Sequence, residues 1–274
     1  MPSLKCKCPA MWLSGLAGIL LSAGCAGLGT PVPTTPLPES TPRLESILDE
    51  LDANDIRLSS FRAAGTITLQ APSLEGVQRF PTGTVAYQRP DKLFVEGRLK
   101  TNAIAFQLQS SGDEFLIEFP TVREVKDRYF YHIKGQKIED VPFDVSPSEV
   151  IDEMFLPEDW GSLKVPRDAR ITAFDPASQT ATFTVGPRHR IRRTVVVSGP
   201  PWRVTRSERY DDEGGVLAIT GRSEYNEKDG VQFPASIQSE FPQQGARMTF
   251  DMRNIRINIP LEPSLFIIQW RPAQ

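Results

Sequence analysis

The cysteine at position 25 is the residue whose type and place most directly predict a chemical modification. It follows a stretch without charge, residues 11–24, which is preceded by Lys5 and Lys7. A positive segment followed by an apolar one is typical of a secretory signal. A spanning helix needs about 20 apolar residues, and this stretch is shorter. The sequence therefore predicts a signal peptide over residues 1–24 with Cys25 at its end.

The five residues Leu21-Ser22-Ala23-Gly24-Cys25 resemble the lipobox of bacterial lipoproteins, with small residues before the cysteine and Ser22 where Leu is usual. The resemblance implies cleavage before Cys25 and lipidation of its thiol, which gives the chain a membrane partner. Cys6 and Cys8 would be removed, so the mature chain would hold no disulfide. The alternative is an ordinary secretory signal followed by an incidental cysteine. Ala26 implies release to the outer membrane, and we expect the protein to face the periplasm.

The composition limits the partners and the secondary structure to expect of the mature chain. Loss of Lys5 and Lys7 takes the net charge from −3 to −5, which argues against a nucleic-acid partner. The 24 prolines and 19 glycines favour turns and β structure over long helices. Prolines recur between Thr, Ser and Glu up to Pro42, so residues 25–42 are predicted to form an extended tether. A disordered leader without a set length is equally compatible with this segment.

Residues 43–274 are predicted to form one mainly β domain. Leu44, Ile47, Leu48 and Leu51 recur at helical spacing, which predicts a helix over residues 43–57. Later segments alternate with period two, as antiparallel strands with one wet face do. A capping box at 146–149 predicts a second helix that interrupts the strands. The strands are expected at 65–70, 83–87, 104–108, 115–119, 171–174, 181–185, 191–197, 202–210, 216–220, 231–241 and 246–259, with an aromatic rim strand near 129–131.

About a dozen strands in one long meander would have to curl, because very wide open sheets are rare. The helices would then cover the inner face of the sheet, and the space between is either a packed core or a cavity. Residues 188–193 carry four arginines. They suit lipid phosphates or an acidic partner, or simply the polar face and turn of a strand.

Motifs for catalysis, metals and cofactors are absent from the sequence. His132 and His189 lack metal-ligand spacing, and no nucleophile elbow, phosphate-binding loop or dinucleotide fingerprint is present. We therefore expect no cofactor, no metal and no enzymatic activity. Carboxylates that pair only in space remain an alternative.

The order of these elements is similar to that of a known family. A lipidated cysteine, a tether and a helix precede "LSSFRAAGTITL" and "TVAYQRPDKLFVEG", and "IRINIPLEPSLF" lies near the end of the chain. Over residues Leu44 to Phe266 this resembles the LolA/LolB group of lipoprotein-localisation factors, and the lipidation favours the LolB-like branch. The resemblance implies an unclosed antiparallel β-barrel, lidded by an N-terminal helix and a mid-chain helical insertion. It also implies a hydrophobic cavity for acyl chains.

Two sets of site residues follow. The resemblance implies a protruding leucine that assists transfer into a membrane; here it is Leu99, with Arg98 and Lys100 beside it to meet anionic headgroups. An ordinary hairpin with one surface leucine is the alternative. Alternation predicts a cavity wall made of Ile67, Leu69, Val85, Leu93, Val95, Ile104, Phe106, Phe115, Ile117, Phe183, Val195, Phe233 and Phe250.

The sequence thus favours an outer-membrane lipoprotein that binds acyl chains of lipids or lipoproteins. Its expected partners are the membrane, these acyl chains and a periplasmic carrier protein. The alternative is an envelope scaffold lipoprotein with a filled barrel that binds a protein partner.

Overall fold

The computed structural model describes residues 36–72, 74, 76–120, 129–133, 153, 160, 163, 169–187 and 189–268. Cys25 and most of the predicted tether lie outside these residues. Residues 36–42 are largely exposed, and Pro38 and Thr41 close a turn there through a backbone hydrogen bond of 3.0 Å. Among the described residues, no helix combines the length and the apolar character needed to cross a membrane.

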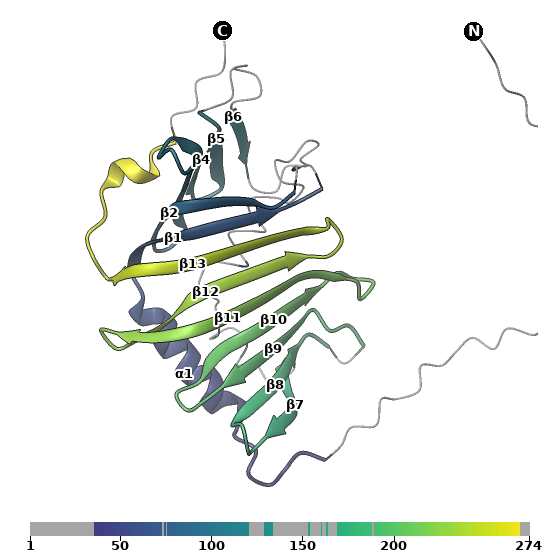
Figure 1. Ribbon diagram of the computed structural model, residues 1–274. Coiled ribbons are helices and arrows are strands. Elements are labelled where there is room, and N and C mark those ends of the chain that lie inside the picture. The colour runs from purple at the N-terminus through teal and green to yellow at the C-terminus, as the bar shows by residue number, and fades with distance from the viewer. Residues whose placement is uncertain are drawn as a thin grey trace, which may run out of the picture. The chain divides into compact units, whose positions relative to one another are not determined.

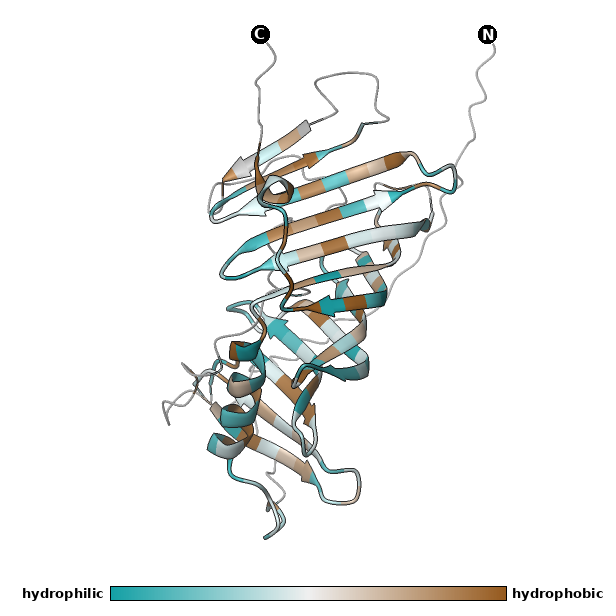
Figure 2. Cartoon of the chain, turned by 90° about the vertical axis from the view of Figure 1, so that its left-hand side faces the viewer, coloured by the Kyte–Doolittle hydropathy of each residue, from teal (hydrophilic) through white to brown (hydrophobic). Residues whose placement is uncertain are grey.

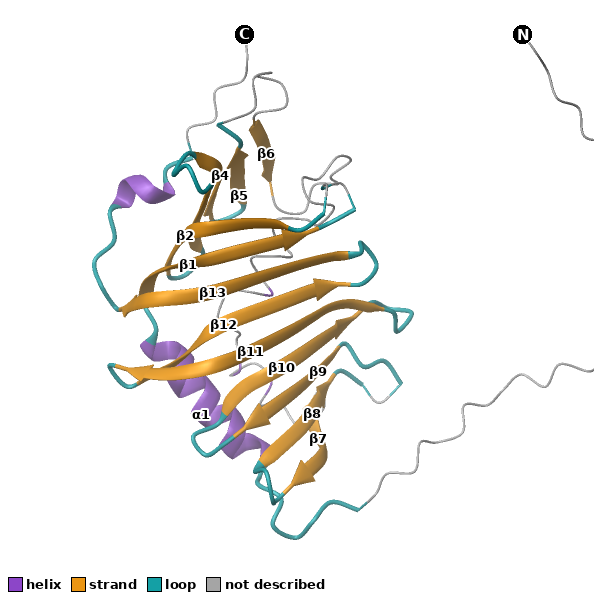
Figure 3. Ribbon diagram, in the orientation of Figure 1, coloured by secondary structure: helices purple, strands orange, loops and turns teal. Residues whose placement is uncertain are grey.

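The described part of the chain is one antiparallel sheet with a single long helix, α1 (Leu44–Arg57) (Figures 1 and 3). This confirms the predicted unclosed, mainly β fold with an N-terminal helix. The strands are β1 (Ser60–Gln70), β2 (Gln78–Gln88), β3 (Lys92–Arg98), β4 (Ile104–Ser111), β5 (Glu114–Glu118), β6 (Tyr129–Ile133), β7 (Ala169–Asp175), β8 (Thr180–Val185), β9 (Arg193–Ser198), β10 (Arg203–Tyr210), β11 (Val216–Lys228), β12 (Val231–Phe241) and β13 (Ala246–Ile257).

The order of the strands differs from the expected single meander. The sheet runs β6-β5-β4-β3-β2-β1-β13-β12-β11-β10-β9-β8-β7, so the first and last strands pair at its centre. The edges are β6 and β7, which follow one another along the chain. Figure 1 shows the direction of the strands turning steadily from β1 to β7, as expected for a twisted sheet. The predicted mid-chain helix falls between β6 and β7, and only Glu153 of it is among the described residues.

Alternation along the strands gives the sheet an apolar inner face. Side chains of β1–β5 and β11–β13 form a continuous core in which Phe61, Tyr87 and Phe250 are almost fully buried. Brown and teal segments alternate along these strands in Figure 2. Burying these apolar side chains against one another removes their surface from water, which stabilises the sheet.

Helix α1 packs its apolar stripe on the inner face of the other half of the sheet. Ile47, Leu48 and Leu51 are buried against β8, β9 and β10. The indole Nε1 of Trp160 donates a 2.7 Å hydrogen bond to Oδ2 of Asp55 and so joins the mid-chain segment to the helix. The spacing of these three residues puts them on one face of a helix, which is why the sequence predicted this element correctly.

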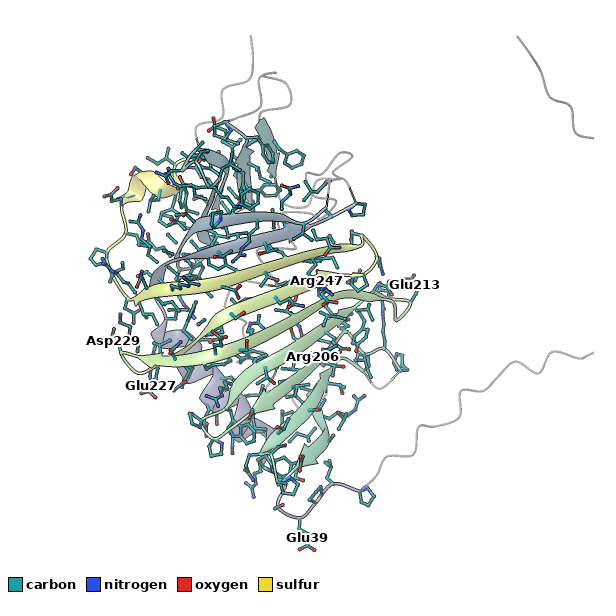
Figure 4. The ribbon with its side chains drawn as sticks, viewed as in Figure 1. Glu39, Arg206, Glu213, Glu227, Asp229 and Arg247 are labelled. Atoms are coloured by element: carbon teal, nitrogen blue, oxygen red, sulfur yellow. The ribbon has the colours of Figure 1, made fainter. Side chains whose placement is uncertain are left out.

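The outer face is polar over β11–β13 but covered over β2 and β3. Arg206 and Arg247 lie on the face turned to the viewer in Figure 4, and Arg247 binds Glu240 at 2.8 Å. Over β2 and β3 the 3-10 helix η3 (Pro263–Phe266) buries Phe266 against Ala86 and Phe94. The outer face is therefore covered in this region, because the C-terminal segment folds back on the sheet.

Candidate functional site

The predicted cavity-wall residues lie in β1–β5, β8, β9, β12 and β13 and, except for Ile104, are buried. Ile104 is half-buried at the start of β4. Phe183 and Val195 contribute to the core beneath α1 instead of the larger core around β1. The sheet thus gathers most of these side chains into two apolar cores, while the ring of Phe115 stacks on that of Phe130 with centroids 6.2 Å apart. Their role as the wall of a ligand cavity stays a prediction.

Three glycines form a row across the inner face of the larger core. Gly65 on β1 pairs with Gly83 on β2, which pairs with Gly97 on β3. A Cβ at Gly97 would lie 2.3 Å from Cε1 of Phe106, and a Cβ at Gly83 would lie 2.7 Å from Cγ1 of Ile67. The missing side chains therefore make a trough in which Phe106 and Ile67 lie.

Several inner-face residues were missed by the sequence analysis. Phe61 and Tyr87 share the parity of the predicted set, and their rings lie 5.7 Å apart, so the pattern contained this signal. Phe80 is out of phase with Val85 and Tyr87, because the β1–β2 register shifts between Gly65 and Ile67. A bulge of this kind adds one residue to a strand and reverses the alternation, which sequence periodicity does not reveal.

The larger core opens where β12 and β13 separate. Their ladder ends at Ser236 and Asp251, although both strands continue. The backbone of Asn254 takes a φ of 52° there, in the left-handed region that asparagine tolerates. A pocket of about 270 Å³ occupies this fork. Its lining combines apolar and charged side chains: Asn226, Glu227, Lys228, Phe233, Ala235, Met252, Arg253, Asn254, Ile255 and Ile257.

Side chains of α1 replace the missing strand pairing at the fork. Oδ1 of Asn54 accepts a 2.7 Å hydrogen bond from the backbone N–H of Gln232, and its Nδ2 donates to the Gln232 carbonyl at 3.1 Å. Arg57 donates to the Gly230 carbonyl at 3.2 Å. Backbone groups left without partners are unfavourable, so these contacts keep β12 in place while its neighbour diverges.

Burial raises the pKa of two tyrosines, Tyr87 and Tyr225, each from 10.0 to about 12. Tyr87 is fully buried, and its hydroxyl donates a 3.1 Å hydrogen bond to the Pro90 carbonyl. Burial raises the pKa of Tyr87 from 10.0 to about 12, because the phenolate would lose its hydration. The hydroxyl is therefore neutral across the physiological range and serves packing.

The predicted membrane-insertion loop is the turn between β3 and β4. Leu99 is 39% exposed, and the turn closes through hydrogen bonds of 2.9 Å between Leu99 and Ala103 and between Asn102 and Leu99. Lys100 is exposed. Arg98 is less available, because its Nε lies 2.6 Å from Oε1 of Glu96. The geometry suits a protruding leucine, but the insertion role itself stays a prediction.

In the part of the chain that the structure describes, no group of three or more His, Cys, Asp or Glu residues could hold a metal ion.

Comparison with known proteins gives matches in structure alone. No family model matches the chain, and no curated protein matches its sequence. A DUF1329 family protein from Desulfovibrio piger superposes with a TM-score of 0.56 at 11% identity, over 83% of this chain and 98% of its own. A LolA superfamily protein from Nitrosomonas europaea gives 0.53 at 12% identity, over 83% and 99% of the two chains.

A third solved structure is a putative outer membrane lipoprotein-sorting protein domain from Vibrio parahaemolyticus. It superposes with a TM-score of 0.51 at 12% identity and covers 81% of this chain and 94% of its own. Each match covers nearly the whole of the other protein, so the similarity extends through the sheet and is not confined to one hairpin. At such low identity it establishes the fold: this chain has the fold of the LolA superfamily proteins.

Proposed function

We propose that this protein is an envelope lipoprotein that binds acyl chains of lipids or lipoproteins on the inner face of its sheet. The observation that carries the proposal is the continuous apolar face of an unclosed sheet, which opens at the fork between β12 and β13. Phe233, Met252 and Ile257 belong both to this core and to the pocket lining. An acyl chain that enters the pocket therefore meets core side chains directly.

Binding of this kind needs no reacting group. Each buried methylene contributes about 0.8 kcal/mol, so a chain of ten buried methylenes gains about 8 kcal/mol before ordering and displacement costs are subtracted. The pocket of about 270 Å³ is smaller than the roughly 300–1,000 Å³ of typical ligand pockets. A long acyl chain would have to displace side chains of the inner face as it enters. The proposal is thus a carrier, not an enzyme.

Two of the structural neighbours support this assignment by their names, one a LolA superfamily protein and the other a putative lipoprotein-sorting domain. The anchor is part of the proposal. Residues 1–24 would be the signal peptide, Cys25 the lipidated residue, residues 25–42 the tether and residues 43–274 the carrier domain. The protein would then face the periplasm from the outer membrane, where it could receive cargo from a periplasmic carrier protein.

Acyl binding is tested with the full chain carrying Cys25→Ala, so that no lipid of its own complicates the result. Native mass spectrometry of the purified protein should show co-purified lipid, and a fluorescent fatty-acid probe should bind saturably. Ile255→Glu places a charge in the pocket and should weaken probe binding about tenfold or more. Gln70→Glu introduces the same side chain at an exposed position of β1 and should leave binding unchanged.

Absence of both lipid and saturable probe binding, in a variant that is folded by circular dichroism, would reject the carrier and favour the scaffold. The anchor has its own test in the same variant: Cys25→Ala should abolish acyl labelling and release the protein from membranes. A variant that stays membrane-bound and labelled would contradict lipidation at this residue.

Transfer is tested separately at the β3–β4 turn. Leu99→Glu replaces the exposed apolar tip by a charge, which resists entry into a bilayer. Delivery of a fluorescent acyl cargo to vesicles that contain phosphatidylglycerol should slow about tenfold, while acyl affinity is unchanged. Lys100→Ala should slow delivery less, because the apolar tip remains. Equal delivery by Leu99→Glu and the parent chain would remove Leu99 from the mechanism.

A further inference from the structure

Two cationic side chains line the pocket at the fork between β12 and β13. Lys228 ends β11, and Arg253 follows Met252 on β13. Met252 lines the same pocket, as do Phe233 and Ile257, and all three belong to the larger core. One pocket therefore brings two cations next to apolar side chains of the inner face.

Lys228 reaches across the fork from one arm to the other. Its Nζ donates a 3.0 Å hydrogen bond to the backbone carbonyl of Ile255 on β13. The β11–β12 ladder continues to Lys228 and Val231, whereas the β12–β13 ladder ends at Ser236 and Asp251. The ammonium group thus lies at the open part of the fork. It has three N–H donors, so the bond to Ile255 leaves capacity for a further acceptor.

Arg253 is exposed at the same pocket. Its partner across the β1–β13 ladder is Ala64, whose small side chain leaves space beside it. The guanidinium group presents five N–H donors in a planar fork. This fork matches the oxygens of a phosphate or carboxylate and binds them in bidentate fashion. Arg253 therefore suits an anion that approaches the pocket from solvent.

Among the described lining residues, Glu227 is the one carboxylate, so the lining carries two cations and one anion, a net charge of +1. Oε2 of Glu227 accepts a 2.7 Å hydrogen bond from Nε2 of Gln232. Figure 4 shows Glu227 and Asp229 at the β11–β12 hairpin. The charge of Asp229 is offset by Arg57, which donates to the neighbouring Gly230 carbonyl. The charge of the pocket thus favours an anionic group.

The two sides of the pocket together indicate the class of ligand. Ligand pockets combine apolar surface with a few polar groups that fix orientation. Here the apolar side suits an acyl tail, and the cationic side suits an anionic head. The carboxylate of a fatty acid and the phosphate of a lipid share this chemistry. This step rests on the acyl binding proposed above.

We propose that Lys228 and Arg253 form a headgroup site at the fork, which selects acyl ligands with an anionic head. The tail of the ligand then lies against Phe233, Met252 and Ile257, and its head lies at the surface beside the two cations. An exposed ion pair raises affinity by at most about fivefold. Two such pairs should together give about a tenfold preference over a neutral ligand with the same tail.

The test measures dodecanoate, dodecyl phosphate, monododecanoylglycerol and inorganic phosphate by calorimetry on the full chain carrying Cys25→Ala. We expect both anionic dodecyl ligands to bind about tenfold more tightly than the neutral glyceride. Arg253→Gln should reduce this preference to about threefold, and its combination with Lys228→Gln to within about twofold. Affinity for monododecanoylglycerol should stay unchanged. Arg256→Gln is the matched control, because Arg256 is also exposed on β13 but does not line the pocket.

The outcomes separate the headgroup site from the carrier function. Equal affinity for the neutral and the anionic dodecyl ligands would overturn the headgroup site and leave the carrier function standing. A preference that survives in the double variant would place the anion elsewhere and overturn the site as well. Binding of inorganic phosphate as tight as that of dodecyl phosphate would show a site for free anions and overturn acyl recognition. Failure of every dodecyl ligand to bind would overturn the carrier function itself.

The two anionic ligands also distinguish the source of the head. A preference shown by dodecanoate alone would support the site and assign it to fatty acids, and one shown by dodecyl phosphate alone would assign it to lipid phosphates. If the double variant does not fold, the fall in preference in Arg253→Gln decides the matter.

Discussion

Replacing Gly65 by alanine tests whether the close approach of β1 to β13 holds the centre of the sheet together. A Cβ at this position would lie 2.0 Å from the backbone carbonyl oxygen of Asp251 and 2.8 Å from its carbon. Carbon–oxygen contacts are normally no closer than about 3.3 Å. The carbonyl would therefore have to move by more than about 1 Å, and it belongs to a central strand whose neighbours on both sides are paired.

The expected loss of stability follows from this geometry. Overpacking a tightly packed region costs about 1–3 kcal/mol. Because the obstacle is backbone and not the end of a flexible side chain, we expect Gly65→Ala to lower the free energy of unfolding by about 3 kcal/mol. For a domain of this size that corresponds to a fall of about 6–12 °C in the unfolding temperature.

Gly221 on β11 is the matched control. A Cβ there would meet nothing within 4 Å, so Gly221→Ala should be neutral or stabilise by up to about 1 kcal/mol through the smaller entropy of the unfolded chain. Urea denaturation monitored by circular dichroism measures both variants, with the slope of unfolding checked for constancy. If Gly65→Ala has a free energy of unfolding within about 0.5 kcal/mol of that of Gly221→Ala, the proposed constraint between β1 and β13 is refuted.

Two further predictions concern pH and the fork. The pKa of Tyr87 is raised to about 12 in the folded protein, so the unfolded chain ionises first and stability is lost between about pH 10 and 12, by at most about 3 kcal/mol from this residue. Urea titrations should show a shallower decline in Tyr87→Phe; an identical decline would contradict the assignment. Asn54→Ala removes two hydrogen bonds to Gln232 and gains helix propensity, so it should lower the free energy of unfolding by about 1–2 kcal/mol. The control Ser46→Ala, at an exposed position of the same helix, should change it little. Equal midpoints for these two variants would show that Asn54 does not support β12.

The sequence predicted the local elements because their signals are local. The helical spacing of Ile47, Leu48 and Leu51 specifies a buried stripe whatever that stripe meets. In the same way, alternation around Val85 and Phe106 assigns each side chain to one of two faces. Most of the inner-face residues follow from that rule, and so does the mainly β character of the fold, whereas its unclosed form was implied by the family resemblance.

Where a strand is irregular, the rule fails for a physical reason. A bulge adds one residue to β2 between Phe80 and Gly83 and so puts Phe80 on the inner face against its parity. The covering of Phe94 by Phe266 joins segments far apart in the sequence. Neither the bulge nor this contact can be predicted from the alternation of apolar residues along a single strand.

The chain by itself determined the motif at Cys25, the helix before β1 and the two-faced character of the strands, because each depends on residues a few positions apart. Tertiary structure alone decided that β1 pairs with β13 and that β12 and β13 separate around a pocket. It also decided that Arg193, Arg209 and Arg222 meet at Glu153. These arrangements depend on which distant segments become neighbours, and that is settled by the packing of the whole sheet, not by any short stretch of sequence.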